Sequence, residues 1–136
     1  MTEAQQRPRI LKNRWFEKFA RKEGIDDGAL VAAVERAEAG LVDADLGGGV
    51  VKQRVARAGE GKSSGFRTIL FFRQGERTVF VFGFAKKDKA NLTAHELATY
   101  RKAARIVLDL DDEAIAGEIA AGRMMEVERG DQDLPK

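Results

Sequence analysis

Basic residues in the middle of the chain stand at spacings that could bind a phosphodiester. Lys52 and Arg54 are two residues apart in a segment that alternates like a strand, so their side chains leave one face about 7 Å apart. That separation allows the two cations to flank one phosphate. Arginine and lysine can stabilise the extra charge of a pentacoordinate phosphate directly. The chain has one histidine, His95, which excludes a mechanism that uses two histidines as acid and base.

The distribution of charge favours a polyanionic partner. The net charge of +2 conceals an uneven pattern, because residues 51–105 carry 13 basic and 4 acidic side chains, a net charge of +9. Residues 106–136 carry 3 basic and 9 acidic side chains, a net charge of −6. Cations that neutralise phosphates release condensed counterions, which favours binding to nucleic acid. The alternative is a solvated surface balanced by the acidic end of the chain.

The composition excludes several classes of protein. There is no cysteine, so disulfides, thiolate catalysis and cysteine zinc sites are ruled out. No apolar run approaches the roughly 18 residues of a membrane span, and the first residues lack the apolar core of a secretory signal. The glycine run at 47–49 does not match a nucleotide-binding motif. We therefore expect a cytoplasmic protein of one domain that needs no cofactor.

Two amphipathic helices are predicted near the start, after a short strand at 9–12. Apolar residues at helical spacing indicate a first helix that ends at Gly24. The second is capped by Asp26 or Asp27 and ends at Gly40. The short connection predicts that the two helices form a hairpin.

Strands dominate the next part of the chain. Residues 41–49 end in three glycines and are expected to be a flexible connection. Alternation and β-branched or aromatic residues then predict antiparallel strands over residues 50–57, 66–73 and 78–86. A loop at 58–65 is predicted to join the first two strands, and a turn at 74–77 to join the last two.

Helices follow the strands. Thr93 and Glu96 form a capping box for a helix that turns Tyr100 inward, and Asp111 can cap a further helix. An edge strand is predicted at 124–128. The fold class is α+β, with an N-terminal helical hairpin packed on one mainly antiparallel sheet and followed by C-terminal helices.

Three stretches of this sequence resemble the signature of a known family. The segments VVKQRVAR at 50–57, GKSSGFR at 61–67 and FGFAKKDKANL at 82–92 are similar to the core of RelE/HigB-type toxins in the RelE/ParE superfamily. The resemblance covers roughly residues 8–110. It implies a RelE-like toxin domain at 1–110, with an acidic helix and tail at 111–136 as an extension of the same domain. One hypothesis for this extension is that it shields the basic strand face when no target is bound.

The resemblance implies a toxin of a type II toxin-antitoxin system. Such proteins are metal-independent mRNA endoribonucleases that act on the ribosome and inhibit translation, and a cognate antitoxin, of helix-turn-helix type in HigB-like pairs, blocks them. Arg67 matches the family's arginine after an aromatic residue and is assigned to phosphate stabilisation. The implied catalytic residues are Lys52, Arg54, Arg67 and Lys86. The implied RNA-binding residues are Arg57, Lys62, Phe84, Lys87 and Lys89.

Each assignment has an alternative. Lys52 and Arg54 could belong to a solvated strand face, Arg67 could form a structural ion pair, and Phe84 could be a core residue. The lysines at 86, 87 and 89 could be ordinary loop residues. Residues 101–136 contain no aromatic residue, unlike many relatives that end in a tyrosine at the site. The alternative functions are a ParE-like inhibitor of DNA gyrase and a noncatalytic RNA-binding member, because fold alone does not decide activity.

Overall fold

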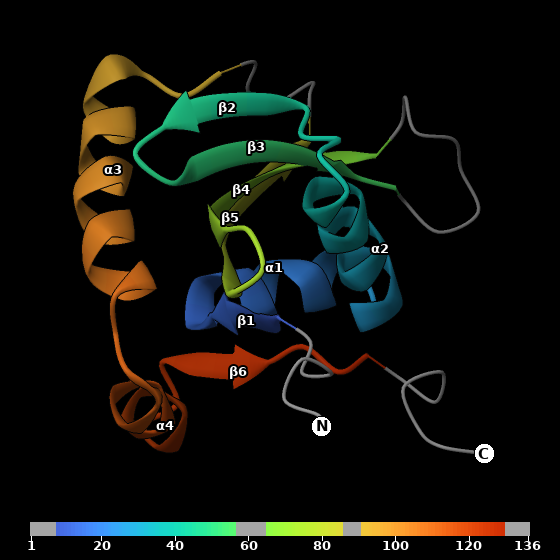
Figure 1. The fold of residues 1–136 in the computed structure, drawn as a ribbon. Coiled ribbons are helices and arrows are strands. Elements are labelled where there is room, and N and C mark those ends of the chain that lie inside the picture. Colours follow the sequence, from blue (N-terminus) through green and yellow to red (C-terminus); the bar gives the residue numbers. More distant parts are fainter. Residues whose placement is uncertain (1–7, 57–64, 86–90, 130–136) are drawn as a thin grey trace.

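The computed structural model describes residues 8–56, 65–85 and 91–129, and Figure 1 shows its fold. Within these ranges six strands form one sheet and four helices pack on it. None of these helices is both long enough and apolar enough to cross a membrane. The elements in chain order are β1 (Arg9–Asn13), α1 (Arg14–Glu23), α2 (Asp27–Glu38), β2 (Ala44–Gly47), β3 (Val50–Val55), β4 (Phe66–Arg73), β5 (Arg77–Ala85), α3 (Ala94–Leu108), α4 (Asp112–Ala120) and β6 (Met124–Glu126).

The sheet has the strand order β2-β3-β4-β5-β1-β6. The strands from β2 to β5 pair antiparallel, β1 runs parallel to β5, and β6 pairs antiparallel with β1 at the edge. This confirms the prediction of a mainly antiparallel sheet with an edge strand near residue 124. The position of β1 between β5 and β6 was not predicted, because the alternation of a short strand does not identify its partner.

Helices cover both faces of the sheet (Figure 1). Phe16 of α1 and Leu30 of α2 are buried in a core on one face, whereas Leu108 of α3 and Ile115 of α4 are buried on the other. α1 lies against β1, β5 and β6, and α2 lies against β3. The predicted N-terminal helical hairpin is not confirmed, since the two helices lie over different strands. The C-terminal helices are present on the opposite face.

Short polar side chains cap the helices, and three of these caps, Asp26, Thr93 and Asp111, lie at predicted positions. Asn13, Asp26 and Asp111 each accept a hydrogen bond from the backbone N–H three residues further on. Thr93 and Glu96 form the predicted capping box at the start of α3. These bonds satisfy N–H groups that have no partner inside a helix, which is why short polar residues set the helix starts.

Residues 41–49 are more ordered than the predicted flexible connection. Ala44–Gly47 forms β2, which pairs with β3 and extends the sheet by one strand. Gly48 and Gly49 close this hairpin at φ values of +63° and +86°, which residues with a Cβ adopt at a cost. A Cβ on Gly49 would also lie 2.8 Å from a methyl of Leu108, so α3 approaches the turn closely. The glycine run therefore serves a tight turn beneath a helix.

The acidic C-terminal segment contributes to the core. Ile115 and Met124 are buried in the core beneath α3, so removal of the segment would expose apolar surface. β6 is separated from β3 by three strands. The described part of the segment is therefore poorly placed to shield the basic face of β3, and residues 130–136 lie outside the described residues.

A buried cation ties β1 to both N-terminal helices. The Nζ of Lys12 lies 2.7 Å from the carboxylate of Glu17 and 3.0 Å from that of Asp27. Glu17 also accepts a hydrogen bond from Arg21, and Asp27 accepts the backbone N–H of Glu128. Burial alone would lower the pKa of the Lys12 ammonium, but the hydrogen bonds and charges of the two carboxylates outweigh it, and the pKa is raised.

We expect this cluster to make stability depend on pH. Hydrogen bonds from Lys12 and Arg21 lower the pKa of Glu17 in the folded protein. The contribution of Glu17 to stability is therefore fully present above its ordinary pKa of 4.5 and is lost as pH falls through the lower pKa of the folded protein. The raised pKa of Lys12 has its effect at alkaline pH. The contribution of Lys12 to stability is fully present below its ordinary pKa of 10.5 and is lost as pH rises through its higher pKa in the folded protein. Glu17→Gln should lower the free energy of unfolding at neutral pH by about 1–2 kcal/mol and flatten its decline in acid.

Urea unfolding at a series of acidic and neutral pH values measures both effects. Glu35→Gln, on the exposed side of α2, is the matched control and should change neither quantity. Equal losses in the two variants would show that the cluster around Lys12 has no special contribution.

Candidate functional site

The strand register brings three predicted site cations onto one face of the sheet. Arg54 in β3 lies directly opposite Arg67 in β4, and Arg67 lies opposite Phe84 in β5. Directly opposite residues have Cβ atoms about 4.5–5.5 Å apart. Lys52 stands opposite Ile69, whose side chain lies in the core beneath α3. Lys52, Arg54 and Arg67 therefore share the face that α3 partly covers, and we call these three residues the cation cluster.

Arg67 has an unpartnered nitrogen and no carboxylate partner within the described ranges. Its side chain is half-buried, and the guanidinium nitrogen Nη1 is buried without a hydrogen-bond partner. Within the described ranges no carboxylate forms an ion pair with it, so the alternative of a structural ion pair finds no support there. A buried donor without a partner is costly, so the neighbourhood of this nitrogen is under strain in the unbound protein.

Lys52 is held by an amide group rather than by a carboxylate. Its Nζ donates a hydrogen bond to Oδ1 of Asn91 at 3.1 Å. Asn91 lies two residues before Thr93, the residue that caps α3. Because an amide carries no net charge, the positive charge of Lys52 remains available to an anion.

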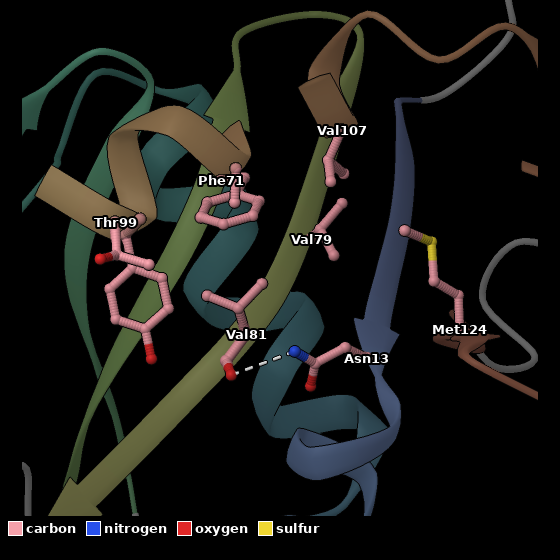
Figure 2. Close-up of a pocket in the computed structure, with 9 residues that line it drawn as sticks. Asn13, Phe71, Val79, Val81, Thr99, Val107 and Met124 are labelled. Atoms are coloured by element: carbon pink, nitrogen blue, oxygen red, sulfur yellow. Dashed lines mark hydrogen bonds between the residues drawn. The ribbon is translucent and has the colours of Figure 1, made fainter. Parts of the chain in front are cut away.

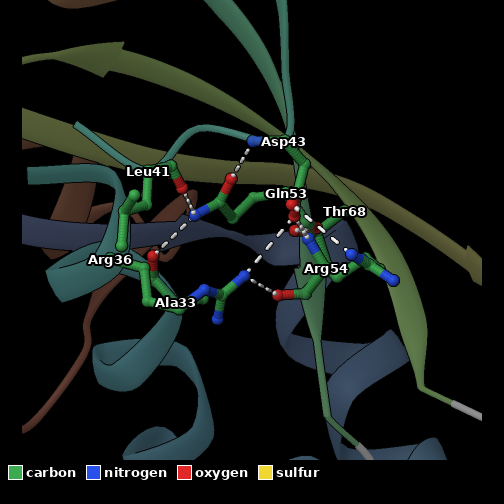
Figure 3. Close-up of polar contacts among 7 residues, drawn as sticks. All are labelled: Ala33, Arg36, Leu41, Asp43, Gln53, Arg54 and Thr68. Carbon is green, nitrogen blue, oxygen red and sulfur yellow. Dashed lines mark hydrogen bonds and ion pairs between the residues drawn. The ribbon is translucent and has the colours of Figure 1, made fainter. Parts of the chain in front are cut away.

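Arg54 is partly engaged in holding the fold. Its guanidinium lies 3.8 Å from the carboxylate of Asp43, which also accepts the backbone N–H of Arg54 at 2.7 Å. Arg36 of α2 reaches the same carboxylate and donates to the backbone carbonyl of Arg54 at 3.1 Å (Figure 3). The charge of Arg54 is therefore shared with Asp43, and we expect it to attract an anion less strongly than Arg67 does.

Gln53 anchors the strand that carries two of these cations. It is 0% exposed, and its Nε2 donates to the carbonyls of Ala33 at 3.0 Å and Leu41 at 3.2 Å (Figure 3). Its Oε1 accepts the backbone N–H of Asp43 at 2.9 Å. Strand alternation turns Gln53 toward α2, away from the cation cluster. A buried amide with these bonds ties β3 to α2 and to the segment before β2.

Phe84 is a core residue in this structure. It is 5% exposed, and its ring centroid lies 5.8 Å from that of Phe82. Stacking of an RNA base requires an open ring face, so the predicted stacking role conflicts with this burial. The strand register, which the sequence does not give, places Phe84 on the same face as Arg67, where it packs in the core beneath α3.

Tyr100 lies on the inner side of α3, as its helical spacing predicts. Its ring centroid is 6.2 Å from that of Phe71 and 6.3 Å from that of Phe82. Burial, with a smaller contribution from the negative charge of Glu96, raises the pKa of the phenol. Tyr100 therefore keeps its proton at neutral pH and is suited to donate a hydrogen bond.

A pocket of about 280 Å³, lined in part by Tyr100, lies beneath α3. Figure 2 shows Phe71, Thr99 and Val107 around it. It is lined by Asn13, Phe71, Val79, Val81, Thr99, Tyr100, Ala103, Val107 and Met124. The side chains of Asn13 and Thr99 are already hydrogen-bonded to backbone groups. The lining contains no cation, so we distinguish this apolar pocket from the cation cluster.

The remaining predicted site residues lie outside the described residues: Arg57, Lys62, Lys86, Lys87 and Lys89. The structure adds Asp43, Arg36 and Asn91 to the surroundings of the cation cluster. Asn91 falls within a stretch that carries the resemblance. Asp43 and Arg36 had no sequence signal, because their contacts depend on how β2 and α2 meet β3. In the described ranges no group of three or more His, Cys, Asp or Glu residues could hold a metal ion.

Comparison with known families places this arrangement in context. A sequence model described as "RelE toxin of RelE / RelB toxin-antitoxin system" matches residues 8–127. The chain belongs to the RelE toxin family. No curated protein matches it at a significant level. Membership of the RelE family makes the chain a toxin of a toxin-antitoxin system and implies a cognate antitoxin. The RelE match includes α4 and β6 as well as the strands that carry the cation cluster.

Proposed function

We propose that this RelE-family toxin is a metal-independent endoribonuclease that cuts mRNA on the ribosome and thereby inhibits translation. Family membership supports the class of protein, and the cation cluster supports the chemistry. A cognate antitoxin of helix-turn-helix type would block the activity. The observation that carries the proposal is Arg67, a half-buried guanidinium with an unpartnered nitrogen and no described carboxylate to neutralise it.

The arrangement of like charges supports a phosphate ligand. Arg54 and Arg67 lie directly opposite each other on adjacent strands, where like charges destabilise a sheet. An anion bound between them would relieve this repulsion. Lys52 lies two residues from Arg54 on the same face, so three cations surround the position that a phosphodiester would occupy.

The proposed reaction is an attack by RNA on its own backbone. A ribose 2′-oxygen bonds to the adjacent phosphorus while the bond to the 5′-oxygen breaks, which leaves a 2′,3′-cyclic phosphate and a 5′-hydroxyl. Arg67 and Arg54 donate hydrogen bonds to the phosphoryl oxygens, whose negative charge increases in the transition state. The 2′-hydroxyl is proposed to lose its proton to solvent, and the ammonium of Lys52 stabilises the oxygen as its negative charge increases. Lys86, outside the described residues, is proposed to supply a proton to the 5′-oxygen.

A map of mRNA 5′ ends after induction in a bacterial host tests this function. We expect cuts in frame with translation for the natural sequence and no cuts for a variant with both Lys52→Ala and Arg67→Ala. A variant with Lys102→Ala and Arg105→Ala removes the same charge from the exposed side of α3 and should cut normally. Induction of the SOS response without cuts would instead indicate gyrase inhibition, and cuts that persist in the first variant would exclude the cation cluster as the site.

A further inference from the structure

We propose that Trp15 is a stacking platform for an unpaired base of the RNA that the cation cluster binds. The inference rests on the proposed function, because it assigns the base-binding part of the same site. Trp15 lies in the first turn of α1 and is 45% exposed. The other large exposed apolar residues of the described ranges, Leu41 and Ile106, are aliphatic and offer no ring face for stacking.

A continuous set of ring contacts leads from Trp15 to the cation cluster. The indole centroid lies 4.7 Å from the ring of Phe82, and the Phe82 ring lies 5.8 Å from that of Phe84. Phe84 stands directly opposite Arg67 in the sheet. Two ring contacts therefore separate the exposed indole from Phe84, which stands beside Arg67. A short stretch of single-stranded RNA can span this distance.

The local fold explains why an indole is held at this position. β1 ends at Asn13, whereas β5 continues to Ala85, so the start of α1 lies beside the free edge of β5. The side chain of Asn13 both caps α1 and donates to the carbonyl of Val81 at 3.2 Å. Phe19, one helical turn further along α1, stacks on the indole at 5.3 Å with an interplanar angle of 14°. The ring is thus supported from within while nearly half of the residue remains exposed.

Stacking on Trp15 would make RNA binding depend on the bases, which the cations do not recognise. Arginine and lysine bind phosphates and carry no information on whether bases are present. An aromatic ring that stacks a base contributes about 1–3 kcal/mol for each base and tolerates different sequences. If Trp15 only completed the ring cluster with Phe19 and Phe82, the affinity for RNA would depend on the phosphates alone.

The fluorescence of Trp15 provides a direct test, because it is the only tryptophan in the 136-residue chain. The probe is a dye-labelled 2′-O-methyl oligoribonucleotide of about eight nucleotides, a length within the usual range of single-strand sites, which cannot undergo attack by a 2′-oxygen. We expect it to quench Trp15 emission as it saturates the toxin. An abasic oligomer with the same phosphates should bind about tenfold more weakly and leave the emission unchanged.

Two variants separate stacking from a structural role. Trp15→Phe keeps a ring and should retain most of the affinity measured by dye anisotropy, whereas Trp15→Ala should lose about tenfold. The inference is overturned if the 2′-O-methyl oligomer with bases binds without changing Trp15 emission, or if the abasic oligomer binds equally well. It is also overturned if neither oligomer binds at low salt. The map of mRNA cuts tests the proposed function independently. If mRNA cuts require Arg67 but the bases of the oligomer do not quench Trp15, only the stacking role of Trp15 is rejected. If the bases quench Trp15 but no cuts occur in mRNA, only the proposed ribonuclease activity is rejected.

Discussion

Arg67→Ala should lower the rate of mRNA cleavage by at least about 100-fold, the usual cost of removing a donor that stabilises transition-state charge. The expected loss is large because Arg67 is the half-buried cation whose charge no described carboxylate offsets, and its buried Nη1 lacks a protein partner. Arg67→Lys should recover only part of the activity, because an ammonium cannot reproduce the planar fork of a guanidinium. Primer extension on a reporter mRNA at matched toxin levels measures the rate.

Substitution of Arg54, the neighbour of Arg67, should reduce the cleavage rate less than substitution of Arg67. Arg54→Ala should cost about tenfold, less than Arg67→Ala, because Arg54 already shares its charge with Asp43. Arg105→Ala, at an exposed position of α3, removes one charge and should leave the rate unchanged. Equal effects of all three substitutions would attribute activity to bulk positive charge, and a fully active Arg67→Ala variant would refute the proposed site. Thermal unfolding of each variant should accompany the rates, since Arg67 is half-buried.

Gln53→Ala should lower the free energy of unfolding by about 2–4 kcal/mol. The substitution removes a fully buried amide and leaves the carbonyls of Ala33 and Leu41 and the N–H of Asp43 without their partner. It also loosens the link between β3, α2 and the segment before β2. We therefore expect reduced mRNA cleavage even under conditions where the variant remains folded.

Urea unfolding measures this change, and Gln74→Ala is its matched control. Gln74 is exposed and donates one hydrogen bond, to the carbonyl of Glu38 at 2.8 Å. Its removal should change the free energy of unfolding by no more than about 0.5 kcal/mol, because water can replace the bond. Similar values for the two variants would mean that the buried hydrogen bonds of Gln53 contribute little to stability.

Local patterns in the sequence were sufficient to predict much of this molecule. Alternation with a period of two placed Lys52 and Arg54 on one strand face, and the structure confirms that register. Short polar residues predicted the starts of α2, α3 and α4, including the capping box of Thr93 and Glu96. These signals act within a few residues of the chain, so they can be read before any tertiary contact is known. The order of the elements and the three signature stretches then led to the RelE family.

Contacts between distant residues could be decided only by the tertiary structure. The pairing of β2 with β3 gives Arg54 its carboxylate partner, Asp43, while Arg67 has none within the described ranges. The insertion of β1 beside β5 sets Trp15 against Phe82. Periodicity assigns a side chain to a face, but its exposure and its neutralising partner depend on which elements pack over that face. For that reason the sequence alone determined that Lys52 and Arg54 share a strand face, and the fold determined that Arg67 stands beside Arg54 and that Arg54 shares its charge with Asp43.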